Sequence, residues 1–249
     1  MPSIHKNILF LLGGNDLEMD AIRDLLKENN YDFIDKKLAW GAKLSEYQAE
    51  LEANKNITIA GIELIEDIQI PSNYIKIDHH NELSGNLSSI EQVAEIIEVT
   101  LNRRQQLVAV NDTTHIAGMR NIGASKEEIE EIRKADRKIQ GVSPEDEIQA
   151  EKDIKQARIQ NGVTLIKTSI QHFSAITDRL EVPKLMVYNE SKLCYYGIGA
   201  NTRIKDEFED LIIERRAYYG GKGEGYFGIV DGAYGLAELE ILINKIINS

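Results

Sequence analysis

Residues 74–81 read YIKIDHHN, a short apolar stretch that ends abruptly in an acid and two histidines. Its β-branched residues favour a buried strand over a helix, so the acid and both histidines would leave the carboxyl end of that strand. Similar runs, each of which predicts a strand, occur at 7–12, 57–62 and 107–110. In an open parallel sheet, ligands bind outside the carboxyl ends of the strands. The residues that follow these runs are therefore the first candidates for chemistry.

Helical patterns lie between the predicted strands. One begins after Asp16, another covers roughly 42–53, and a third begins at Ser88, where Ser88 and Glu91 form a capping-box pattern. Such an alternation of strands and helices implies an α/β fold whose mostly parallel sheet is doubly wound, with helices on both faces.

The stretch 125–160 is charge-rich, since 18 of its 36 residues are Asp, Glu, Lys or Arg. It predicts two solvated helices, beginning near Ser125 and at Ser143-Pro144, that link two domains. Beyond it, strand signals at 163–168, 184–188, 192–198 and 226–230 alternate with helical patterns at 171–180, 205–217 and 236–247. We therefore expect an N-terminal domain over 1–124, a helical linker over 125–160 and a smaller C-terminal α/β domain over 161–249.

Composition narrows the function classes. The 249 residues carry a formal charge of −12, which argues against a surface for long duplex nucleic acid. A single cysteine, Cys194, excludes an internal disulfide and a multi-cysteine zinc site, and suits a reducing, cytoplasmic location. No apolar run approaches the ~20 residues of a membrane span, so no membrane partner is expected.

Every predicted strand end in the first half carries a carboxylate, and two carry histidine. Carboxylate with imidazole is a ligand set for Mn²⁺, Zn²⁺ or Fe²⁺, and carboxylate alone suits Mg²⁺. Each residue also has a structural interpretation: Asp16 or Asp20 can favour a helix N-terminus, Asp112 can stabilise a turn, and His115 can serve as a structural hydrogen-bonding group. Two adjacent histidines after an acid are harder to explain by packing alone.

IDHH at 77–80 resembles the signature of the DHH phosphoesterase family, which includes single-strand exonucleases, oligoribonucleases, cyclic-dinucleotide phosphodiesterases and manganese pyrophosphatases. GGNDLEMDAI at 13–22 resembles the family's first motif, with Gly14 in place of the usual His and with Glu18 and Asp20 at the two acid positions. Glu63 falls where the second motif has Asp, and Asp112 in NDTTHI resembles the later Asp-Thr motif.

The C-terminal half extends this resemblance. GGKGEGYFG at 220–228 is similar to the glycine-rich Gly-Gly-Gly-His segment of the family's associated C-terminal domain, although it lacks the His. YYGIGANTRI at 195–204 is similar to the strand that often carries an Arg in that domain.

The resemblance implies metal-assisted hydrolysis of a phosphoester or phosphoanhydride in a small nucleotide-like or short oligonucleotide substrate. The expected metal is Mn²⁺ or another divalent ion such as Mg²⁺, Fe²⁺ or Zn²⁺. The implied metal ligands are Asp20, Glu63, Asp78, His79 and Asp112, with Glu18 as a weaker candidate. His80 and Asp78 are the expected catalytic residues. The candidate substrate-binding residues are Arg203, Gly220, Gly221, Lys222, Gly223 and His115.

Two other hypotheses remain open at this point. Because the first-motif His and the C-terminal His are missing, the chain is alternatively a catalytically inactive binding protein for a nucleotide or another anion. The third hypothesis is an unrelated metal enzyme on a doubly wound sheet, with Asp78, His79, Asp112 and His115 as ligands and a non-phosphate substrate. The sequence leaves the oligomeric state open.

Overall fold

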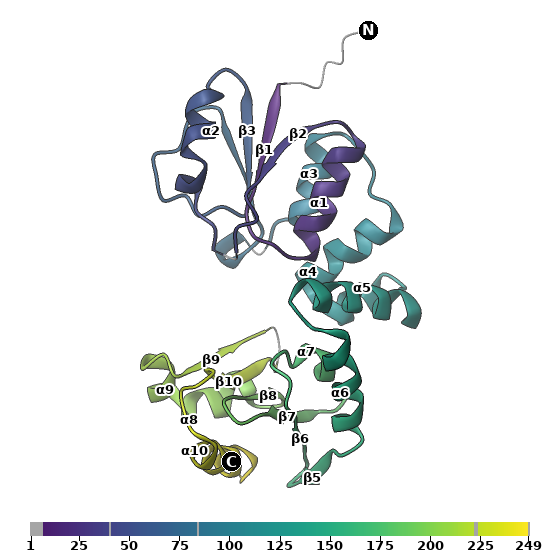
Figure 1. The fold of residues 1–249 in the computed structure, drawn as a ribbon, viewed down its shortest axis with the longest axis vertical. Helices are drawn as coiled ribbons and strands as arrows, with labels where there is room; N and C mark the ends of the chain where they lie inside the picture. The colour runs from purple at the N-terminus through teal and green to yellow at the C-terminus, as the bar shows by residue number, and fades with distance from the viewer. Residues whose placement is uncertain (1–6, 40, 84, 222–223, 249) are drawn as a thin grey trace. The chain divides into compact units, whose positions relative to one another are not determined.

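The computed structural model describes residues 7–39, 41–83, 85–221 and 224–248 (Figure 1). The chain divides into two compact units, Met1–Gln140 and Gly141–Ser249, each with its own sheet. The boundary falls inside the expected linker 125–160. The first of the two linker helices therefore belongs to the N-terminal unit and the second to the C-terminal unit.

The N-terminal unit is a four-stranded parallel sheet with helices on both faces. Its strands, in the order β2-β1-β3-β4, are β1 (Ile8–Leu12), β2 (Asp32–Asp35), β3 (Thr58–Ile62) and β4 (Tyr74–Ile77). Its helices are α1 (Leu17–Glu28), α2 (Gln48–Ala53), α3 (Ser89–Ile96), α4 (Arg103–Asn121) and α5 (Lys126–Ile139), with short 3₁₀ turns η1 (Leu44–Tyr47) and η2 (Asn81–Leu83).

Alternation along the strands divides the core of this unit into two layers. Phe10 and Leu12 of β1 pack with α1 and α3, whereas Leu9 and Leu11 pack with η1 and α2 on the opposite face. Figure 1 shows α2 on one side of the sheet and α1 and α3 on the other. The expected doubly wound α/β fold is confirmed in this unit. Among the described residues, no helix is both long and apolar enough to cross a membrane.

The strand expected at 107–110 is wrong, because these residues lie inside helix α4. The helix begins at Asn102, whose side chain accepts a hydrogen bond from the N–H of Gln105 in a capping box. Leu107 and Val108 are buried in a cluster shared with α1 and α5. A four-residue apolar run has no period that separates strand from buried helix, and tertiary packing decides the outcome here.

The C-terminal unit contains a mixed six-stranded sheet in the order β5-β6-β7-β8-β10-β9. Its strands are β5 (Arg158–Gln160), β6 (Val163–Lys167), β7 (Lys184–Tyr188), β8 (Leu193–Gly197), β9 (Ala217–Gly220) and β10 (Tyr226–Ile229). Only β6 and β7 pair in parallel; the other neighbouring strands described in this sheet are antiparallel.

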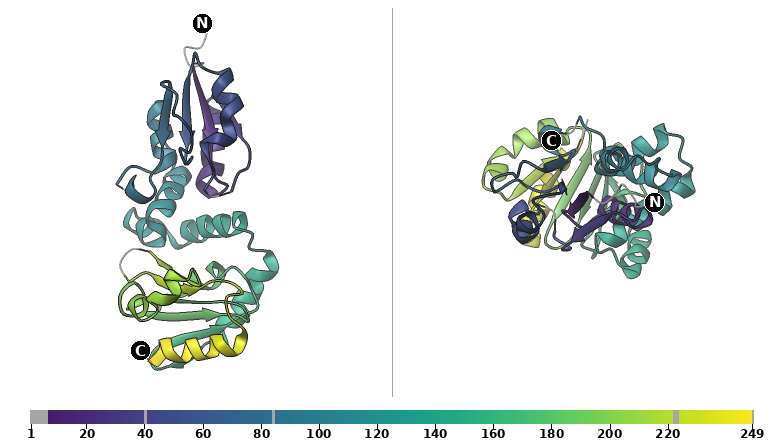
Figure 2. Two further views of the ribbon diagram at one scale, coloured as in Figure 1. Left: turned by 90° about the vertical axis from the view of Figure 1, so that its left-hand side faces the viewer. Right: turned by 90° about the horizontal axis from the view of Figure 1, so that it is seen from above.

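Helices cover both faces of this second sheet. They are α6 (Pro144–Ile154), α7 (Ser174–Thr177), a π-helical turn η3 (Ala200–Ile204), α8 (Lys205–Glu207), α9 (Glu209–Ile213) and α10 (Leu236–Asn248). Residues of α10 and η3 pack on one face, and residues of α6 and α7 on the other. Figure 2 shows α10, in yellow, running along the face of the sheet that it covers. The helix expected at 205–217 is shorter than predicted, because Ala217 already belongs to strand β9.

Candidate metal centre

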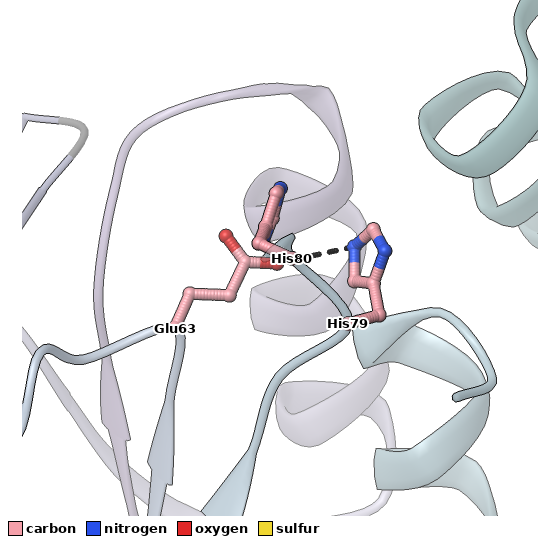
Figure 3. A group of neighbouring side chains, drawn as sticks. All are labelled: Glu63, His79 and His80. Atoms are coloured by element: carbon pink, nitrogen blue, oxygen red, sulfur yellow. Dashed lines mark ion pairs between the residues drawn. The ribbon is translucent and has the colours of Figure 1, made fainter. Parts of the chain in front are cut away.

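His79 is buried among carboxylates from three other segments of the N-terminal unit. Its Nε2 lies 2.8 Å from Oδ2 of Asp112, 3.4 Å from Oε2 of Glu18 and 3.6 Å from Oε1 of Glu63. Figure 3 shows the ring of His79 facing the Glu63 carboxylate, with His80 beside them. We call Glu18, Glu63, His79, His80 and Asp112 the His79 cluster.

Glu63 reaches the cluster from the end of β3 through an uncommon backbone conformation. Its φ of 53° lies in the left-handed region, which a residue with a side chain seldom adopts. The loop after β1 packs tightly against it: a Cβ added at Gly13 would lie 2.7 Å from the Glu63 carbonyl oxygen. Glycine at position 13 therefore permits the close approach of the loop between β1 and α1 to the backbone of Glu63.

The start of helix α3 holds two of the carboxylates in place. The Ser89 hydroxyl donates a 2.8 Å hydrogen bond to Oε1 of Glu63, and the Ile90 N–H donates a 3.0 Å bond to Oε1 of Glu18. The helix itself begins with the predicted capping box of Ser88 and Glu91. N–H groups of a helix's first turn are free to bind acceptors, and the helix dipole favours negative charge there.

The electrostatics indicate an excess of negative charge. Burial raises the pKa of Glu18 to about 8; contact with His79 opposes this shift, and the charges of Asp112 and Glu63 add to it. Burial lowers the pKa of His79, but its contacts with Asp112, Glu18 and Glu63 outweigh that effect and raise the pKa to about 12. One buried imidazole thus has to balance several carboxylates, so a cation that joins them would be stabilised.

Two buried polar atoms of the cluster also lack a hydrogen-bond partner among the residues that the structure describes. They are Oε2 of Glu18 and Nε2 of His79, the latter because the close Asp112 oxygen does not meet hydrogen-bond geometry. Buried polar atoms are nearly always satisfied, and a place for an ion is one explanation for exceptions. Ligand atoms of Glu63, His79 and His80 lie within 4.8 Å of one another, as do those of Glu18, His79 and Asp112. The donor set therefore fits a divalent cation of the Mn²⁺, Fe²⁺ or Zn²⁺ type.

Asp78 orients the neighbouring histidine. Its Oδ1 accepts a 2.9 Å hydrogen bond from the His80 N–H and lies 3.1 Å from Nδ1 of the same residue. The ring of His80 lies 4.3 Å, centroid to centroid, from that of His79. His80 is half-buried, so one side of its ring remains open to a ligand.

The structure does not bring the expected ligand Asp20 into the cluster. Its carboxylate pairs with Arg23 on the same helix, and Arg23 also donates to Asp35 at 2.6 Å. Instead, Asp16 lies near the cluster: burial raises its pKa to about 6, and the charges of Glu63 and Asp112 contribute. The sequence pattern indicated only a helix cap at Asp16, a role that it also fills by accepting a bond from the Met19 N–H.

The candidate substrate-binding residues lie in both units. In the C-terminal unit, Arg203 is in η3, Gly220 ends β9, and Gly221 has a φ of 83°. The side-chain amide of Asn201 donates to the Gly221 carbonyl, so this loop is tied to η3. Lys222 and Gly223 lie outside the described residues. His115, in the N-terminal unit, is exposed and has non-helical dihedral angles that break α4.

No family model matches the chain, and no curated protein matches it. Among solved structures, a pGpG-specific phosphodiesterase, PggH from Vibrio cholerae, is 10% identical with a TM-score of 0.46, covering 96% of this chain and 98% of its own. A DHH domain, described as a member of a family of ribosomal proteins, is 12% identical with the same TM-score, covering 97% and 87%. At these values the likeness carries no argument about activity, substrate or metal.

Proposed function

We propose that this protein is a divalent-metal-dependent phosphohydrolase that cleaves a phosphoester or phosphoanhydride bond in a small nucleotide-like or short oligonucleotide substrate. The observation that carries the proposal is the buried Nε2 of His79, which has carboxylates from three other segments within 3.6 Å. The similarity of residues 77–80 and their companion motifs to DHH phosphoesterases supplies the reaction class. Mn²⁺ is the proposed ion, with Mg²⁺, Fe²⁺ and Zn²⁺ as alternatives.

Glu18, Glu63, His79 and Asp112 are the residues that would hold the ion, and Asp16 and Asp78 are candidates for further ligands. Asp20 is the weakest candidate because it is paired with Arg23. A bound divalent ion lowers the pKa of a water molecule and neutralises phosphate charge.

His80 is the proposed proton donor to the leaving-group oxygen. Asp78, which lies 3.1 Å from Nδ1 of His80, would hold the proton on that nitrogen and stabilise the charged ring. Nε2, the other ring nitrogen of His80, would then donate its proton to the leaving-group oxygen. In the C-terminal unit, Arg203 with Gly220 and Gly221 remains a candidate binding site for an anionic part of the substrate.

The metal content of the purified protein, measured by mass spectrometry, tests the first half of this proposal. Wild type should retain Mn²⁺ or a related ion near one per chain, and His79→Gln should lose it. His172→Gln is a matched control, because His172 is an exposed histidine of the C-terminal unit. A wild-type protein that holds no metal, even after reconstitution with Mn²⁺, contradicts the proposal.

Turnover tests the second half. Incubation with nucleotides and dinucleotides should give hydrolysis that depends on the metal, stops with a chelator and is abolished by Asp78→Ala. Hydrolysis that Asp78→Ala leaves unchanged would assign the activity to another site or to a contaminant.

A second candidate function is ligand binding without turnover. Gly14 favours it, because this position, where the resembling motif has histidine, offers no side chain, and a Cβ there would lie 3.9 Å from Oε2 of Glu63. A site that has lost an imidazole at this point would bind a nucleotide and leave it intact. Hydrolysis by the pure protein that is removed by Asp78→Ala rules this function out.

A further inference from the structure

A cavity of about 350 Å³ opens beside the His79 cluster within the N-terminal unit. Glu63 and His80 form part of its wall, and Gly14, Gly41 and Lys76 form another part. Its volume is at the small end of the range for ligand pockets, which is about 300–1,000 Å³. The cavity therefore has room for part of a small molecule next to the proposed metal ion.

Lys76 is the only lysine or arginine among the described residues that line this cavity. Its Nζ lies 3.7 Å from Oδ2 of Asp78 and 3.8 Å from Oε2 of Glu66, and both distances exceed that of a hydrogen bond. The ammonium group thus forms ion pairs with both carboxylates and a hydrogen bond with neither. Its N–H groups can donate to an incoming anion without first giving up one of these partners.

The geometry of strand β4 directs Lys76 toward the cavity. Side chains alternate along a strand, and Ile77 is buried against α1 and α3 on one face of the sheet. Lys76 and Tyr74 therefore project from the other face. The residue aligned with Lys76 on the neighbouring strand is Gly61, and the side chain of Tyr74 packs over it. Lys76 stands two residues before Asp78, so its position in strand β4 places it beside the His79 cluster.

The charge pattern of the cavity indicates what it would bind. Glu63, Glu66 and Asp78 line it together with Lys76, so an anion would be repelled except near a bound metal ion and near this lysine. These are the two positive positions that the phosphate groups of a ligand can occupy. A ligand with two phosphate groups can use both.

We propose that Lys76 binds a phosphate group of the substrate other than the one that is cleaved. This inference rests on the proposed function, because the cleaved phosphate would lie at the His79 cluster. Lys76 is then a specificity-determining residue, and the site prefers small substrates with two phosphate groups to those with one.

Thymidine 5′-monophosphate and thymidine 3′,5′-bisphosphate test the proposal, because they differ by one phosphate group. Titration calorimetry on Mn²⁺-reconstituted wild type should show at least tenfold tighter binding of the bisphosphate. Lys76→Gln should weaken bisphosphate binding about tenfold, with little effect on the monophosphate and with unchanged manganese content. Lys76→Arg should keep the preference. Lys55→Gln, which removes the same charge from an exposed position of the same unit, should behave as wild type.

Equal affinities of wild type for the two ligands overturn the proposal, as does Lys76→Gln binding the bisphosphate as tightly as wild type. The manganese content of the same samples tests the proposed function separately. If wild type holds no manganese, titration of metal-free wild type and Lys76→Gln with the bisphosphate still decides the role of Lys76. Loss of the lysine should then weaken bisphosphate binding, and unchanged binding overturns the proposal.

Discussion

Nε2 of His79 and Oδ2 of Asp112 lie 2.8 Å apart, although one residue follows strand β4 and the other belongs to helix α4. Asp112 stands three residues before His115, where α4 is broken. The contact therefore connects the loop after β4 with the last regular turn of α4 before its break at His115. Asp112 of α4 thus completes a group whose other acids are Glu18, in the first turn of α1, and Glu63, at the end of β3.

This contact predicts unequal roles for Asp112 and Asp20, although the resemblance implies both as metal ligands. Asp112→Asn should reduce the affinity for Mn²⁺ at least tenfold, because it removes a negative charge next to His79. Asp20→Asn should leave the affinity close to that of wild type, because Asp20 pairs with Arg23 outside the cluster. Manganese titration of both variants measures the difference. Equal losses would show that Asp20 contributes to the site.

The first motif could not decide whether Glu18 or Asp20 faces the site. Glu18 and Asp20 are two residues apart in α1, so their side chains point about 200° apart around the helix axis. Both cannot face one ion. The motif alone did not reveal which of the alternate acids faces the site, because that depends on how α1 rests on the sheet.

Local signals were sufficient elsewhere. Strands β1, β3 and β4 were predicted from compact β-branched runs, and α3 from its capping box. Glu63 and His79 were identified because they directly follow strands. Strand β2 was missed because its sequence, DFID, is short and half-exposed and lacks an apolar run. Asp112 was chosen as a candidate because it follows the run 107–110, which was wrongly predicted to be a strand. That run is apolar because it packs against α1 and α5 as part of helix α4.

Asp16 provides a second prediction, because its two roles can be separated. Asparagine caps helices about as well as aspartate, so Asp16→Asn should change the free energy of unfolding by less than about 1 kcal/mol in the metal-free protein. The same variant should bind Mn²⁺ more weakly, because it removes a half-buried carboxylate whose pKa responds to the charges of Glu63 and Asp112. Urea unfolding and metal titration measure the two effects. Unchanged metal affinity would limit Asp16 to its capping role.

Cys194 gives a prediction for the C-terminal unit. The residue lies in β8 and is 2% exposed, and burial raises the pKa of its thiol to about 11. Since the thiolate is the reactive form, Cys194 should react with a disulfide reagent at pH 8 more than a hundredfold more slowly in the native protein than in urea. The absorbance of the released thiol follows the reaction. A rapid reaction of the native protein would contradict the burial of β8.

The stability of the metal-free protein should fall as pH rises from 5.5 to 8.5. The pKa of Glu18 is about 8 in the folded chain and near its ordinary value of 4.5 when unfolded, so the folded state binds more protons between these values. The pKa of His79, raised from 6.5 to about 12, acts in the same direction: its contribution to stability is fully present below pH 6.5 and is lost as the pH rises toward 12.

Urea unfolding in a chelator at several pH values measures this dependence. Glu18→Gln should flatten it, because glutamine keeps an oxygen for the Ile90 N–H but does not ionise. Glu82→Gln, at an exposed position, should unfold with the wild-type dependence. Saturating Mn²⁺ should reverse the trend in wild type, since metal ligands bind in their deprotonated forms. A wild-type free energy of unfolding that stays level or rises over this range without metal would contradict the raised pKa values of Glu18 and His79.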